Sequence, residues 1–475
     1  MNFQNHVWGP AINRLAMTFV LGLSMAFLAG CDDDDDSPSQ PDQTIVQVAQ
    51  GNSNLSTLVS AVSKYPDLVT TLTGNGAYTV FAPTNAAFTN LLSAIGQTSL
   101  DDVPEDVLKN ILQYHVVTSD AVKSNQLTSG NVESANGEDI AVTVTNGVKL
   151  NGTVNVVNPD VEASNGVVHV VDAVLVPPSI VPIVGTIVSP AYFNKNFTTL
   201  IAAVKAADPS ILTTLLGNGP SDNKLTLFAP TNEAFTAAGI TALPNEATLN
   251  AVLTYHVIDD EVLATELPSG SATVGTLGGD FFLSNNGSSG VFINGTSQVT
   301  ATDITGSNGV VHVINRTLIP PSKTIAGIAT ELSSAGTPEF TQLVAALART
   351  SGTGTDLLEA ANNGEANLTV FAPTDAAFEE LYSALGVDGI DDIPLATLTA
   401  VLEHHIVASR VFSTDLTDSN VPTLNGDVII SATNKTITDG NGNVASLSTN
   451  ASLLNVLATN GVIHTIDRVL LPGED

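Results

Sequence analysis

The pattern of apolar and polar positions repeats three times along the chain. Each copy begins with helix-like apolar spacing, as in "LSTLVSAVSKYPDLVTTL" and "FTTLIAAVKAADPSILTTL", and ends in a continuous apolar run such as "NGVVHVVDAVLVP". Apolar residues three and four positions apart predict a helix with one buried face, whereas a short uninterrupted apolar run predicts a strand covered on both faces. The pattern therefore predicts three copies of one α+β unit, with helices first and an antiparallel sheet later.

A nearly constant ten-residue phrase lies between the helical segments of each copy. It reads "TVFAPTNAAF", "TLFAPTNEAF" and "TVFAPTDAAF". Pro83 cannot donate to a strand ladder and should end a short buried strand, while Thr84 or Asn85 suits the N-cap of the next helix. We expect Phe88 to fold back from that helix onto Phe81, so that the phrase forms a strand-to-helix corner. The corner residues of the three copies are Phe81, Pro83, Phe88, Phe228, Pro230, Phe235, Phe371, Pro373 and Phe378.

Two histidines recur in every copy. The first ends a helical segment that begins at Pro104, Pro244 or Pro394, where proline suits the first turn. The second lies in the closing apolar run, which follows an Asn-Gly hairpin signal. The repeated histidines are His115, His256 and His405 at the helix end, and His169, His312 and His464 in the closing strand.

These phrases predict three domains, at residues 42–178, 185–321 and 323–473. The segment before them has a different composition: after Arg14 comes "AMTFVLGLSMAFLAG", an apolar run too short for an ordinary membrane span. A charged start, a short apolar core and small residues before a cut are typical of a secretory signal peptide. We therefore predict a signal peptide over residues 1–30 and an acidic, proline-containing tether over residues 31–41.

Leu28-Ala29-Gly30-Cys31 resembles the lipobox of bacterial lipoproteins. The resemblance implies acylation of Cys31, with chains such as palmitate, and stable anchoring requires more than one acyl chain. The alternative is a secreted protein with an unmodified cysteine. Cys31 is the only cysteine of the sequence, so disulfides are excluded and the fold must rest on packing.

Acidic residues greatly outnumber basic ones. The chain has 47 Asp and Glu against 14 Lys and Arg, a formal net charge of −33. Such a surface repels phosphate backbones, which argues against nucleic acid as a partner. High solubility is the simplest consequence of this charge.

The corner phrase, the Tyr-His pair and the closing "NGVVHVVD" phrase together resemble the fasciclin-like domain, an extracellular adhesion module. The resemblance covers nearly all of the chain after the tether and implies a β-sandwich or wedge with N-terminal helices packed on it. It also implies adhesion or matrix contact without catalysis. In animal relatives the Tyr-His region is linked to receptor binding, which points to Tyr114, His115, Tyr255 and His256. The third copy departs from this pair, with His404 and His405.

Other readings of the histidines and turns are possible. One histidine pair per unit could be a repeated metal site, but no cysteine and no consistent carboxylate accompanies it, so hydrogen-bonded core histidines are the better interpretation. "DGNGN" at Asp439 is similar to half of a calcium loop, yet it lacks the required Gly and Glu and fits a hairpin turn. The G-x-S-x-G nucleophile motif is absent from the sequence. We predict no enzyme, no cofactor and no metal.

The sequence thus leads to an expected function. We expect a lipid-anchored adhesion protein of the bacterial cell envelope, at the outer membrane or cell surface rather than the inner membrane. Its partners would be a cell-surface or extracellular matrix protein or polysaccharide, bound multivalently, and the membrane through the N-terminal lipid. The alternative is a periplasmic ligand-binding or scaffolding lipoprotein. Ligand, binding face and membrane leaflet are not specified by the residues.

Overall fold

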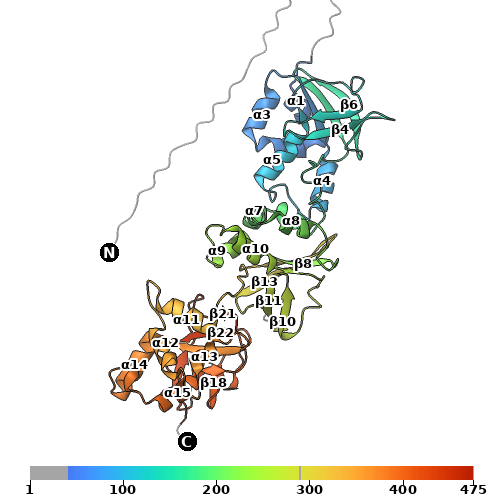
Figure 1. Ribbon diagram of the computed structural model, residues 1–475. Coiled ribbons are helices and arrows are strands. Elements are labelled where there is room, and N and C mark those ends of the chain that lie inside the picture. Colours follow the sequence, from blue (N-terminus) through green and yellow to red (C-terminus); the bar gives the residue numbers. More distant parts are fainter. Residues whose placement is uncertain (1–40, 288–289, 474–475) are drawn as a thin grey trace, which may run out of the picture. The chain divides into compact units, whose positions relative to one another are not determined.

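A computed structural model describes residues 41–287 and 290–473, and three similar units follow one another in it (Figure 1). The predicted signal peptide, Cys31 and nearly all of the tether lie outside the described residues. In the described ranges, no helix has the length and apolar character needed to cross a membrane.

The first unit opens with helices and closes with strands. Its helices are α1 (Ile45–Gln50), α2 (Ser56–Ser63), α3 (Pro66–Thr73), α4 (Asn85–Ala94) and α5 (Glu105–Tyr114). Its strands are β1 (Tyr78–Pro83), β2 (Val116–Val117), β3 (Gly130–Glu133), β4 (Asp139–Thr143), β5 (Lys149–Leu150), β6 (Val154–Ala163) and β7 (Gly166–Val171).

The second unit repeats this order. Its helices are α6 (Ser189–Tyr192), α7 (Thr198–Ala206), α8 (Pro209–Leu216), α9 (Asn232–Ala237) and α10 (Glu246–Thr254). Its strands are β8 (Leu225–Pro230), β9 (Val257–Ile258), β10 (Gly270–Thr276), β11 (Gly279–Asn285), β12 (Val291–Ile293), β13 (Ser297–Gly306) and β14 (Gly309–Ile314).

The third unit has the same order of helices, but its described residues form eight strands, in two sheets of four. Its helices are α11 (Ile325–Ser333), α12 (Thr341–Thr350), α13 (Leu357–Asn362), α14 (Asp375–Leu385) and α15 (Leu395–Glu403). Its strands are β15 (Leu368–Pro373), β16 (Ile406–Val407), β17 (Ser419–Pro422), β18 (Asp427–Ser431), β19 (Thr436–Thr438), β20 (Val444–Ser446), β21 (Val456–Ala458) and β22 (Gly461–Ile466).

The mixed α+β fold agrees with the prediction, but two details differ. The segment expected to be one helix is two, because Pro66 and Pro209 each start a new helix, α3 and α8. The sheets are not wholly antiparallel either: the closing strand runs parallel to the first in every unit, as β7 does to β1. Helices and hairpins lie between these two strands in sequence, and a parallel pair requires such a long connection.

The ten-residue phrase forms the expected strand-to-helix corner, and Thr84 rather than Asn85 is the N-cap. Strand β1 ends at Pro83, and the Thr84 hydroxyl caps helix α4 by accepting from the Ala87 amide at 3.2 Å. The Asn85 side chain ties α4 to α2, accepting from the Thr57 amide at 2.9 Å.

The expected contact of Phe88 with Phe81 does not form. Alternate residues of a strand face opposite sides, so Phe81 points away from the helices into a second core among the strands, where its ring stacks on His169. Phe88 lies in the helix-side core instead. The same separation holds for Phe228 and Phe235, and for Phe371 and Phe378.

Candidate functional site

The helix-end histidines are core residues in all three units. His115 is 1% exposed; the Leu175 amide donates to its Nε2 at 2.8 Å, so its Nδ1 carries the proton and donates to the Ile111 carbonyl at 2.7 Å. Burial lowers the pKa of His115 to about 4, so the ring is neutral at pH 7. His256 and His405 have the same pair of backbone partners and the same lowered pKa of about 4.

The tyrosines that precede these histidines are buried as well. The Tyr114 hydroxyl donates to the Asp139 carbonyl at 2.7 Å and accepts from the Asn151 side chain at 3.0 Å. Tyr255 makes the equivalent bonds to Asp280 and Asn294, and burial raises its pKa to about 12. These Tyr-His pairs hold the helix end to the strands and are closed to a macromolecular partner in this structure.

The third unit has a histidine in place of this tyrosine, and the side-chain contacts at this position differ. His404 replaces the tyrosine, is 1% exposed, and donates from Nδ1 to the Asn425 carbonyl. Its Nε2 is buried without a hydrogen-bond partner among the described residues. His404 therefore bonds through one ring nitrogen to the turn before β18, whereas each tyrosine hydroxyl bonds to two residues, one of them an asparagine side chain.

The closing-strand histidines form a second repeated core element. His169 is fully buried, its Nε2 donates to the Val122 carbonyl at 2.9 Å, and its Nδ1 accepts from the Asp160 amide at 3.2 Å. Burial lowers the pKa of His169, and it lowers that of His464 to about 4. His312 has equivalent partners. These six repeated histidines are thus structural groups with both ring nitrogens engaged.

The sequence raised two candidate metal sites, at the histidine pairs and at the "DGNGN" segment. Within residues 41–287 and 290–473, no group of three or more His, Cys, Asp or Glu side chains is placed to hold a metal ion. Asp439 of the "DGNGN" segment accepts from the amides of Asn441 and Asn443 and shapes the turn between β19 and β20. The segment is a hairpin turn, as the sequence favoured.

The Asn-Gly pair before each closing strand does more than form a turn. Asn165 is 5% exposed; its side-chain oxygen accepts from the Ile45 amide at 2.9 Å, and its nitrogen donates to the carbonyls of Leu72 and Gly74 at 2.8 and 2.9 Å. It therefore joins the start of α1 to the end of α3. Asn308 and Asn460 make the same three bonds in their units. We call this arrangement the Asn clamp.

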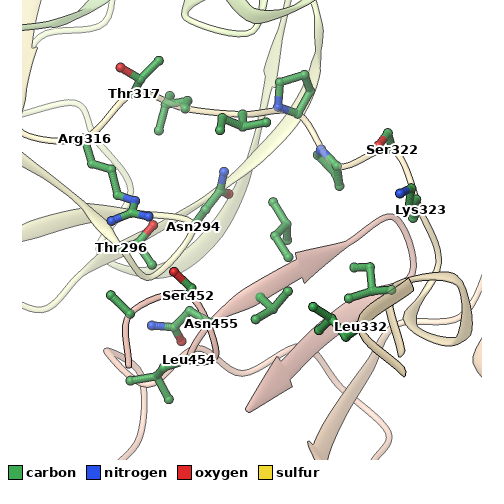
Figure 2. A pocket seen from close by; sticks show the side chains of 18 of the residues that line it. Asn294, Thr296, Arg316, Thr317, Ser322, Lys323, Leu332, Ser452, Leu454 and Asn455 are labelled. Carbon is green, nitrogen blue, oxygen red and sulfur yellow. The ribbon is translucent and has the colours of Figure 1, made fainter. Parts of the chain in front are cut away.

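A cavity with polar and charged walls lies where the second and third units meet. It encloses about 440 Å³ and is lined by β12–β13 loop residues, by the connector after β14 and by the segment before β21 (Figure 2). We call it the junction pocket. Such a volume lies within the range of ordinary small-molecule sites. The labelled polar residues of its walls are Asn294, Thr296, Arg316, Thr317, Ser322, Lys323, Ser452 and Asn455.

Specific contacts fix the two walls of the junction pocket. The buried Asn455 side chain donates to the Gly295 carbonyl across the junction at 2.8 Å. Phe412 packs so closely on Gly295 that a Cβ there would lie 2.7 Å from the phenylalanine Cβ. The Arg410 guanidinium lies 3.9 Å from the Phe282 ring centroid, and burial lowers its pKa.

Sequence reasoning missed these junction residues because it weighed what the copies share. The signal lies in their differences: Asn455 occupies the position of Asp160 and Asp303, the residues whose amides face the closing-strand histidines. An aspartate could not donate to the Gly295 carbonyl. Arg410 and Phe412 likewise flank Val411 where Ala121 and Lys123 flank Val122.

Comparisons with known proteins identify the family. The Fasciclin domain matches residues 53–177, 195–320 and 338–472. Protein sll1483 of Synechocystis is 47% identical over 136 residues, 28% of this chain and 74% of that protein. Transforming growth factor-beta-induced protein ig-h3 of Sus scrofa is 30% identical over 441 residues, which is 90% of this chain but only 57% of the relative's length.

Two further similarities concern surface proteins. The cell surface glycolipoprotein MPB83 of Mycobacterium bovis is 38% identical over 141 residues, 28% of this chain and 61% of that protein. A FAS1 domain pair from the insect cell adhesion molecule Fasciclin I matches with a TM-score of 0.28 and 20% identity, over 58% of this chain and 97% of that one. Since the Fasciclin domain matches well over half of the sequence, the chain belongs to the Fasciclin domain family, in three tandem copies.

Proposed function

We propose that this protein is a lipid-anchored adhesion protein of the bacterial cell envelope, which binds other cells, matrix or a surface polymer through its tandem Fasciclin domains. The observation that carries the proposal is the repetition of one adhesion-family domain three times in one chain. The similarity to a mycobacterial cell surface glycolipoprotein supports a place in the envelope. The same internal contacts recur in each domain, which leaves the exposed faces to differ in what they bind.

Repetition suits adhesion because linked weak contacts reinforce one another. Once one domain binds a surface, its neighbours meet that surface at a high effective concentration, so the combined affinity far exceeds that of one contact. The buried histidines offer no free base in this arrangement, so the proposal assigns no catalysis to them.

The first experiment locates the native protein. Intact cells are treated with protease or labelled with antibody against residues 42–473, and the Cys31→Ala variant serves as the control for anchoring. We expect labelling of intact cells by the native chain and release of the variant from the membrane fraction. Protection of the native chain until the outer membrane is opened would contradict a surface adhesin and favour the periplasmic alternative.

A second experiment tests adhesion itself. Cells that display the chain are compared with cells that lack it for attachment to surfaces coated with matrix protein or polysaccharide. Deletion of one domain should weaken attachment far more than in proportion to the loss, provided that all three domains bind. Equal attachment by cells that display a single domain would contradict the multivalent mechanism.

A further inference from the structure

The junction pocket combines side chains from two Fasciclin domains, and its charge differs from that of the chain as a whole. Figure 2 shows the Arg316 side chain on the wall contributed by the second domain, with Ser452 and Asn455 on the wall contributed by the third. Because Asn455, Phe412 and Arg410 fix the junction, both walls keep their places without a ligand.

The Arg316 guanidinium has no ion-pair or hydrogen-bond partner among the described residues. Among the bases of residues 41–287 and 290–473, it alone is partly buried and has no ion pair, side-chain hydrogen bond or aromatic ring against its charged group. Arg468, the equivalent residue of the third domain, approaches Glu380 at 4.0 Å. The other cation of the pocket, Lys323, is already paired with Glu331 at 2.6 Å. The pocket therefore carries one uncompensated positive charge in a chain of −33.

Two substitutions among the repeats remove negative charge from this region. Asn315, beside Arg316, occupies the position of Asp172 and Asp467 and makes the same bond to a backbone amide as they do. Asn455 on the opposite wall occupies the position of an aspartate in the other two domains. Both replacements lower the cost of bringing an anion next to Arg316.

The other lining residues indicate which chemical groups a ligand of the junction pocket would carry. Thr296 and Ser452 contribute hydroxyl groups to the walls (Figure 2). The lining also includes the apolar side chains of Ile328, Leu332 and Val456. A planar guanidinium matches a carboxylate with two parallel hydrogen bonds. One free cation balances one negative charge, and a dianion would leave charge uncompensated in so acidic a chain.

We propose that the junction pocket binds an organic monocarboxylate with an apolar body, whose carboxylate pairs with Arg316 and whose body covers Ile328, Leu332 and Val456. This site is independent of the adhesive function proposed above. A sugar acid carries the same carboxylate on a hydroxylated body, so glucuronate among the probes below tests whether the apolar body is required.

The purified full chain is titrated with octanoate, and binding is followed by calorimetry and by ligand-observed saturation-transfer NMR. Octanol provides the same body without charge, octylammonium provides the opposite charge, and glucuronate provides a carboxylate on a hydroxylated body. We expect octanoate to bind more tightly than all three. Equal binding of octanol would overturn the role of Arg316, and equal or tighter binding of glucuronate would overturn the role of the apolar wall.

Three variants of the full chain complete the test. Arg316→Gln should weaken octanoate binding about tenfold or more, because a charge-assisted pair is lost. The exposed Ser452→Glu change should weaken it as well by placing a like charge at the rim. Arg468→Gln, the matched arginine of the third domain, should leave it unchanged. Unaltered affinity in Arg316→Gln, or no octanoate binding by a native chain whose melting transition is intact, would refute the proposal.

Discussion

The Asn clamp gives the sharpest prediction of stability. Replacing Asn165 by alanine removes three hydrogen bonds and leaves the Ile45 amide and the Leu72 and Gly74 carbonyls without their partner. Each buried group left unpaired costs about 1–3 kcal/mol, and the Gly74 bond is only partly buried, so we expect a loss of about 4 kcal/mol from the free energy of unfolding of the first domain. Aspartate should cost more than alanine at pH 7, because it turns a carboxylate oxygen toward two carbonyls.

Hydrogen exchange measured by mass spectrometry can read this loss domain by domain. At about 1.4 kcal/mol per tenfold, the amides of β1 and β7 should exchange about a thousandfold faster in Asn165→Ala. The second and third domains serve as internal references in the same sample. Asn131→Ala, which removes one exposed side-chain bond on β3, is the matched control. A change below about tenfold in β1 would refute the reasoning, as would an Asp variant more stable than the Ala variant.

Three further changes test other parts of the structure. Gly166→Ala should destabilise the first domain, because the added Cβ would lie 2.2 Å from the Tyr78 carbonyl oxygen. Gly364→Ala is the control, since its Cβ would meet nothing within 4 Å. Equal melting temperatures of the two variants would contradict the predicted clash. Asn455→Asp should remove the hydrogen bond to the Gly295 carbonyl and loosen the junction of the second and third domains. Amide hydrogen exchange near Gly295 should then become faster, and an unchanged rate would contradict this role of Asn455. Acid should weaken all three domains. In the folded state the pKa of the helix-end histidines is about 4, below the ordinary value of 6.5. The unfolded chain therefore binds more protons than the folded chain, and the free energy of unfolding falls as the pH drops from 6.5 toward 4. At pH 5 the loss is about 2 kcal/mol per helix-end histidine, read as a lower denaturant midpoint. In the first domain His115→Gln should remove this part of the loss and leave the part due to His169, whose pKa burial also lowers, and an undiminished loss would contradict the assignment.

The features that could be predicted from the sequence are those set by neighbouring residues. Pro83 ends a strand and Thr84 caps a helix because each acts on backbone groups within a few positions. Burial of the closing strand follows from its unbroken apolar run. Pro66 starts a second helix although apolar spacing continues on both sides of it, so the spacing alone predicted one helix.

Contacts between distant segments were decided only by the tertiary structure. Strand pleating sends Phe81 and Phe88 into different cores, although they are seven positions apart and both apolar. Asn165 predicted a turn, yet its side chain bonds to Ile45, 120 positions away in sequence. No periodicity encodes such a bond, because it depends on how the helices pack on the sheet.

The three copies and their strand-to-helix corners were thus determined by the sequence itself, because repetition and local backbone preferences can be recognised along the chain. The junction pocket was not, because its walls come from two domains and exist only where these meet. Arg316 and Asn455 are ordinary surface-type residues until the fold brings their segments together. The residues that the three copies share therefore predict the fold of one domain. Only the tertiary structure shows which of the residues that differ between copies lie next to one another.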